Sequence, residues 1–137
     1  MGLLSDRVVL VSGGTQGVGA EVARAAVREG ATVAITGRRA AIGEKLAADI
    51  GGLFVQADVA DVASAQASVA TVIERLGRVD ALVNAAGLTD RGTLVDTTPE
   101  LFDAHIAINL RGPFFLMQAV VRHLLARAAP GGVVNVI

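Results

Sequence analysis

The residues best placed to do chemistry form a glycine cluster near the start of the chain. An aliphatic run at residues 8–11 ends at a serine, and a helical pattern begins directly after the glycines. A strand, a glycine turn and a helix in this order aim free backbone N–H groups at an anion. We predict a diphosphate site here rather than a tight turn without a ligand. Its contacts come from Ser12, Gly13, Thr15, Gln16, Gly17, Val18 and Gly19.

Each glycine of this turn has its own expected role. Gly13 lets the chain turn at the end of the strand, where other residues would be strained. Gly17 has no side chain to hold a ligand away from the backbone, and Gly19 lets the helix pack close to the sheet.

The elements that position these residues alternate regularly along the chain. Short apolar runs predict strands at 7–12, 32–36, 53–56, 79–83 and 133–137, and helical patterns predict helices at 17–29, 40–50, 61–76 and 99–129. Alternating strands and helices form right-handed crossovers and a parallel sheet that is covered on both faces. The prediction is one α/β domain over residues 1–137. It is a Rossmann-type, doubly wound, three-layer α/β/α fold with five strands in the order 3-2-1-4-5.

Ligands of such sheets bind beyond the carboxyl ends of the strands, so the residues after each strand are candidates. Arg38 and Arg39 follow the second strand, and no acidic residue lies between Thr32 and Ile42. Arginine suits a ribose 2′-phosphate, whereas a carboxylate suits the 2′-hydroxyl. NADP(H) is therefore favoured over NAD(H), although Gln16 adds no second positive charge to the glycine turn. The alternative is a solvated arginine pair in an exposed turn.

The third and fourth strands end at further polar residues. Asp58 could accept a hydrogen bond from an adenine amino group, or act only as a turn residue. Asn84 could join the strand-exit loops through its amide. Ala85, Ala86 and Gly87 leave room for a flat ring to lie on the backbone.

The last predicted helix contains Pro113 four residues after Asn109. Proline has no N–H, so the carbonyl of Asn109 loses its helical partner and a kink is expected. The free carbonyl would either bind an ordered water or mark a purely structural bend.

Composition excludes several classes of function. A net charge of −1 gives no basic field for nucleic acid or an anionic membrane, and the absence of cysteine excludes thiol chemistry. His105 and His123 lack neighbours at metal-ligand spacing, so no metal site is expected. The sequence lacks a signal peptide and any apolar run of about 18 residues, which indicates a cytoplasmic protein. Apolar residues all around the 99–129 helix favour a homo-oligomer formed through it.

Taken together, these motifs resemble the short-chain dehydrogenase/reductase family. The glycine turn matches that family's first motif with Ser12 in place of threonine, and Asn84 to Gly87 match its Asn-Asn-Ala-Gly motif with the second Asn replaced. The resemblance implies that Asp58 and Val59 contact adenine. It also implies that Asn109 is catalytic, its main chain positioning a proton-relay water. The expected activity is hydride transfer between NADP(H) or NAD(H) and an alcohol or carbonyl substrate.

One departure from that family is large. The chain has no tyrosine, and its only lysine is Lys45, so the family's Tyr-x-x-x-Lys pair is missing. We expect residues 1–137 to be the cofactor-binding half of a longer enzyme, ending before the catalytic serine. The alternative is a non-catalytic dinucleotide-binding or regulatory module.

Overall fold

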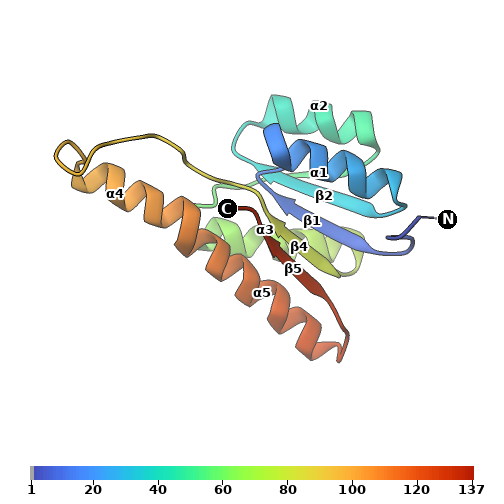
Figure 1. Ribbon diagram of the computed structural model, residues 1–137. Helices are drawn as coiled ribbons and strands as arrows, with labels where there is room; N and C mark the ends of the chain where they lie inside the picture. Colours follow the sequence, from blue (N-terminus) through green and yellow to red (C-terminus); the bar gives the residue numbers. More distant parts are fainter. Residues whose placement is uncertain (1) are drawn as a thin grey trace.

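The computed structural model describes residues 2–137, which form a five-stranded parallel sheet between two layers of helices (Figure 1). The strand order is β3-β2-β1-β4-β5, as predicted. The strands are β1 (Val8–Ser12), β2 (Thr32–Gly37), β3 (Leu53–Gln56), β4 (Ala81–Asn84) and β5 (Gly132–Asn135).

Helices α1 (Gly17–Arg28) and α2 (Ala40–Ile50) cover one face of the sheet. Helices α3 (Val62–Leu76) and α5 (Gly112–Ala126) cover the other. Alternate residues of β1 supply the two cores, because successive side chains of a strand point to opposite faces. Val9 and Val11 pack under α1, and Leu10 packs under α3 and α5.

The predicted helix starts are confirmed where a side chain caps them. Asp61 accepts a hydrogen bond from the backbone N–H of Ser64 (3.2 Å) at the start of α3. Thr98 accepts one from Leu101 (3.1 Å), and Pro99 occupies the first turn of α4 (Pro99–Ile106). Such caps satisfy N–H groups that have no partner inside the helix.

The predicted continuous helix over 99–129 is wrong in two respects. It is divided into α4, a π-helical turn at Ala107–Arg111 and α5, and it ends at Ala126. The N–H of Gly112 donates to the carbonyl of Ala107, five residues back. The irregularity falls where Pro113 predicts one, and it takes the form of the π-helical turn that joins α4 to α5 (Figure 1). The chain turns at the end of α5 because Ala128 adopts a left-handed conformation (φ 49°).

Strand boundaries also differ by a few residues from those predicted. β1 starts at Val8 rather than residue 7, and β5 ends at Asn135 rather than 137. β4 starts at Ala81 rather than 79, because the N–H of Val79 donates to His123 Nε2 (3.2 Å) on α5. β5 is exposed along its whole length at the edge of the sheet.

Asp80 joins three elements at the amino end of the sheet. Its buried carboxylate accepts hydrogen bonds from the N–H of Val8 and from Arg78 Nε, both at 2.8 Å, and Arg127 lies 3.9 Å away. Burial alone would raise the pKa of Asp80, but these hydrogen bonds and the two arginine charges together lower it. The carboxylate therefore remains charged in the folded chain.

We predict that His123 makes stability depend on pH. Burial and the charge of Arg127 lower the pKa of His123 below 6.5, against the opposing charge of Asp80. As the pH falls, the unfolded chain takes up a proton at His123 before the folded chain does. The free energy of unfolding is therefore unaffected by His123 above about pH 6.5 and decreases below it. Urea unfolding from about pH 8 to about pH 5.5 measures this loss. The His123→Gln variant, whose amide oxygen accepts without titrating, should lose less stability; equal losses in the two proteins would contradict the prediction.

Candidate functional site

A cavity of about 1190 Å³ opens at the carboxyl edge of the sheet, where β1, β2 and β4 end. It is lined by every residue that the sequence predicts for the site except Gly19, which is buried. The predicted residues that line it are Ser12, Gly13, Thr15, Gln16, Gly17, Val18, Arg38, Arg39, Asp58, Val59, Asn84, Ala85, Ala86, Gly87 and Asn109.

The glycine turn fits its place only because it lacks side chains. Gly13 has φ +74°, and a Cβ there would lie 2.4 Å from the backbone nitrogen of Ala86. The exits of β1 and β4 are thus in direct backbone contact. A Cβ at Gly19 would lie 2.0 Å from the carbonyl oxygen of Gly13, so Gly19 packs against the turn itself. Gly17 has φ +58° with nothing within 4 Å of an added Cβ, so its backbone faces open space.

The amino terminus of α1 is open to an anion. Gln16 stands at its N-cap without a side-chain capping bond, and the first turn holds no acidic residue. By contrast, α3 and α4 are capped by Asp61 and Thr98. The unpaired N–H groups and the positive end of the helix dipole suit a phosphate.

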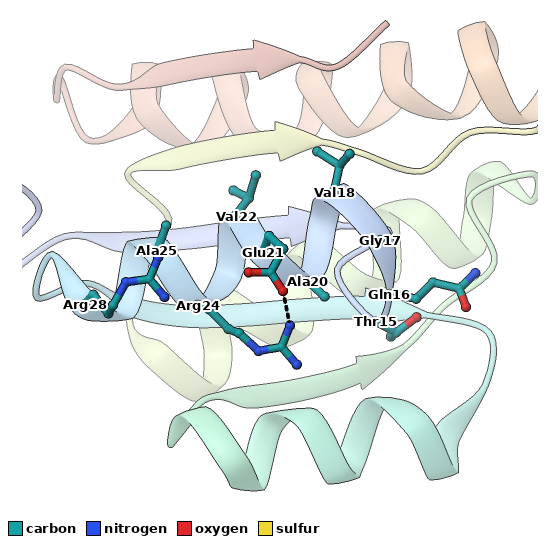
Figure 2. A pocket seen from close by; sticks show the side chains of 10 residues that line it. All are labelled: Thr15, Gln16, Gly17, Val18, Ala20, Glu21, Val22, Arg24, Ala25 and Arg28. Carbon is teal, nitrogen blue, oxygen red and sulfur yellow. Dashed lines mark hydrogen bonds and ion pairs between the residues drawn. The ribbon is translucent and has the colours of Figure 1, made fainter.

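A second, shallower hollow of about 830 Å³ runs along the outer side of α1 (Figure 2). Figure 2 shows Arg24 folded onto Glu21, while Gln16 extends beyond the end of the helix. The Glu21 carboxylate pairs with Arg24, and Arg28 is the other charged residue that lines this hollow.

The cavity has a positive end at the turn between β2 and α2. Its charged lining residues are Arg38, Arg39 and Asp58. Both arginines are exposed, and Arg39 Nη2 donates a hydrogen bond to Gln16 Oε1 across the cavity mouth. Gln56 Nε2, at the end of β3, donates to the carbonyl of Arg38 (3.0 Å).

Asp58 is partly engaged in its own turn. Its Oδ1 accepts from the N–H of Ala60 (3.0 Å), and its N–H donates to Ser64 Oγ (2.9 Å). The turn role is therefore present, and it engages Oδ1 and the backbone N–H of Asp58 rather than Oδ2. Val59 is held against α5, because a Cβ on Gly112 would lie 2.2 Å from the Val59 carbonyl oxygen.

Asn84 bonds to a strand exit that the sequence analysis did not single out. It is 4% exposed, and its Nδ2 donates to Asn135 Oδ1 on β5 (2.8 Å). Within residues 2–137, its buried Oδ1 has no hydrogen-bond partner. Asn135, which contacts Met117 through its own amide, also lines the cavity. The sequence could have indicated Asn135, because this residue lies opposite Asn84 when the predicted strands β4 and β5 pair in parallel.

Asn109 lies in the π-helical turn, and its side chain holds the loop after β4. Its Oδ1 accepts from the N–H of Leu88 (2.8 Å), and its Nδ2 donates to the Leu88 carbonyl (3.0 Å). This pair of bonds fixes the chain directly after Gly87. The sequence pointed to the Asn109 carbonyl and did not predict this role for its side chain.

Two other features bear on the kind of site. Across residues 2–137, no group of three or more His, Cys, Asp or Glu side chains could hold a metal ion. The same part of the chain contains no helix with the length and apolarity needed to cross a membrane.

Comparison with known families agrees with this geometry. The model for "short chain dehydrogenase" matches residues 7–137. The chain belongs to the short-chain dehydrogenase family. The family resemblance and the Rossmann-type fold expected from the sequence are therefore confirmed.

Known relatives of this short-chain dehydrogenase chain are about twice as long. Sorbitol dehydrogenase of Cereibacter sphaeroides is 39% identical over 134 residues, which cover 96% of this chain and 52% of that protein. The NADP-dependent (R)-specific alcohol dehydrogenase of Lentilactobacillus kefiri is 37% identical over 136 residues, covering 96% and 54%. The crystal structure of gox2181 superposes with a TM-score of 0.93 at 33% identity, covering 97% and 54%. The chain thus spans about half the length of the relatives it matches.

We predict that Gly17→Ala separates ligand binding from folding. Alanine at positive φ costs about 1–2 kcal/mol of folding stability, and its methyl group would lie where a diphosphate approaches the backbone. Gly51→Ala is the matched control, because Gly51 has φ +69° and equally open surroundings at the end of α2. Calorimetry should show similar unfolding for both variants. Only Gly17→Ala should weaken dinucleotide binding, by roughly tenfold or more; equal binding by the two would contradict the prediction.

Proposed function

We propose that this chain binds a nicotinamide dinucleotide, NADP(H) in preference to NAD(H). In the whole protein, that cofactor would exchange a hydride with an alcohol or carbonyl substrate. The observation that carries the proposal is the geometry of the glycine turn. The turn packs against the exit of β4, and it leaves the amino terminus of α1 uncapped beside a cavity that is lined by two arginines.

The lining residues fit such a cofactor from one end to the other. The N–H groups of the turn from Thr15 to Val18 would hold the diphosphate, with Ser12 and Thr15 beside them. Asp58 and Val59 would border the adenine. The flat backbone from Ala85 to Gly87 would lie under the nicotinamide, with Asn84 beside it in the lining of the cavity.

The preference for NADP(H) rests on charge at the ribose end. Arg38 and Arg39 are exposed at the cavity mouth, and no carboxylate lies in the segment from Thr32 to Ile42. A guanidinium can make a forked, charge-assisted contact with a 2′-phosphate. The relative from Lentilactobacillus kefiri that carries "NADP-dependent" in its name supports the same preference.

Hydride exchange with an alcohol or carbonyl is supported by the relatives' names, which include sorbitol dehydrogenase and an alcohol dehydrogenase. The bound cofactor supplies the hydride chemistry, and the protein orients it. We propose that Asn109 serves catalysis from the π-helical turn. The chain has no tyrosine, and Lys45 is exposed on α2 outside the cavity lining. We therefore propose that the groups that move the substrate's proton are not among residues 1–137.

We expect the chain to bind NADPH more tightly than NADH in a fluorescence titration. Arg38→Asp should reverse this preference, because a carboxylate repels the 2′-phosphate and accepts from the 2′-hydroxyl. The loss for NADPH should be roughly tenfold to a hundredfold. Arg28→Asp makes the same charge change at the far end of α1 and should leave the ratio unchanged. If Arg38→Asp also leaves the ratio unchanged, Arg38 plays no part in the preference.

We further propose that α4 and α5 join two copies of the chain. Large apolar side chains recur every fourth residue along the exposed side of these helices, and α4 has no buried residue of its own. Contiguous exposed apolar surface of this kind is typical of an interface. The side chains are Phe102, Ile106, Leu110 and Phe114, which are 59%, 40%, 61% and 53% exposed.

We predict that Phe114→Glu shifts the chain toward the monomer, because a buried carboxylate without a partner would oppose association. Sedimentation velocity measures the shift. Ile42→Glu is the control, since Ile42 is exposed on α2, across the sheet from α5. A wild-type chain that remains monomeric at high concentration would refute the interface.

A further inference from the structure

The two arginines at the cavity mouth are held by glutamines from two other strand exits. Gln16, in the turn after β1, accepts a hydrogen bond from the guanidinium of Arg39. Gln56, at the end of β3, donates to the backbone carbonyl of Arg38 (3.0 Å). One contact fixes a side chain and the other fixes the main chain of the same turn.

The turn between β2 and α2 also rests directly on the glycine turn. A Cβ on Gly37 would lie 2.6 Å from Thr15 Cγ2, so the two turns are packed together. The Gly37 carbonyl accepts from the N–H of Ala57 (3.0 Å), which ties the turn to the exit of β3. The backbone that carries Arg38 and Arg39 is thus held from both sides before any ligand binds.

We propose that Gln16 and Gln56 are positioning residues that set the preference for a 2′-phosphate over a 2′-hydroxyl. The inference rests on the proposed binding of NADP(H). According to this inference, the choice between the two cofactors depends on how the turn between β2 and α2 is held, and not on the charges of Arg38 and Arg39 alone. An unrestrained arginine has many rotamers, and ordering it on binding reduces affinity.

The amide of Gln16 is suited to this role because it is neutral. Its Oε1 orients Arg39 without cancelling the positive charge. A carboxylate at the same position would hold Arg39 equally well but would repel a phosphate. Arg24 illustrates the contrast, because its charge is paired with Glu21 on the outer side of α1 (Figure 2).

The test is a fluorescence titration of the chain with NADPH and with NADH, comparing the ratio of the two dissociation constants. Gln16→Ala should reduce the preference for NADPH about fivefold, the equivalent of one net hydrogen bond. Gln56→Ala should reduce it about twofold to threefold, because it releases only the main chain of the turn. Gln16→Glu should reduce it by roughly tenfold or more. The three variants change only two side chains, both exposed, so the variants should fold, which circular dichroism checks.

Gln66→Ala is the matched control, since Gln66 is exposed on α3 and does not line the cavity. A double-mutant cycle then separates positioning from direct contact. In an Arg39→Ala background, removing Gln16 should change the ratio no further, because Gln16 acts through Arg39. An additive loss would overturn the positioning role of Gln16.

The outcomes distinguish this inference from the proposed function. One outcome is that the wild-type chain prefers NADPH while the Gln16→Ala and Gln56→Ala variants keep its ratio of dissociation constants. That result overturns the positioning role of the two glutamines and leaves the proposed cofactor in place. If the wild-type chain shows no preference for NADPH, the proposed cofactor preference is wrong, and so is the positioning role of the two glutamines. A reduced preference for NADPH in both variants, with the preference of Gln66→Ala unchanged, supports the positioning role of the two glutamines.

Discussion

The site depends on one steric constraint, the backbone contact between the exits of β1 and β4. No side chain fits at Gly13, which faces the Ala86 nitrogen, or at Gly19, which faces the Gly13 carbonyl. Because both positions lack a Cβ, the first turn of α1 can begin close to the sheet with its N–H groups pointing into the cavity. The rest of the lining is arranged around this opening, since parallel strands end at one common edge.

Around that opening, polar side chains join segments that are distant in sequence. Asn109 holds Leu88, Asn84 holds Asn135, and Gln16 holds Arg39. Each contact fixes one strand exit relative to another element, so the cavity is preorganised rather than assembled by the ligand. At the opposite edge, Asp80 and His123 attach the start of β4 to β1 and α5. The sheet is thus fastened at both ends of β4.

The fold was predictable because its signals are local. Apolar runs indicated the strands, the caps Asp61 and Thr98 indicated the helix starts, and the alternation of strands and helices indicated a parallel sheet. The predicted site residues were also found together, since the sheet edge gathers whatever follows each strand. The pairings were not predictable, because the partners lie 21 to 51 residues apart and depend on side-chain direction. The π-helical turn was not predictable either. Pro113 indicates that a backbone hydrogen bond is missing, but it does not determine which irregular turn the helix adopts there.

The π-helical turn has a consequence for the register of the long helix. A turn with hydrogen bonds five residues back contains one more residue than a regular α-helix of the same rise. Each helical residue corresponds to about 100° of rotation. An extra residue in a regular helix would turn α4 by about that angle relative to α5, and the wide turn at Ala107–Arg111 absorbs this rotation. A single-codon loss within this turn would therefore restore a regular helix and leave both the direction of α4 and the Rossmann core unchanged.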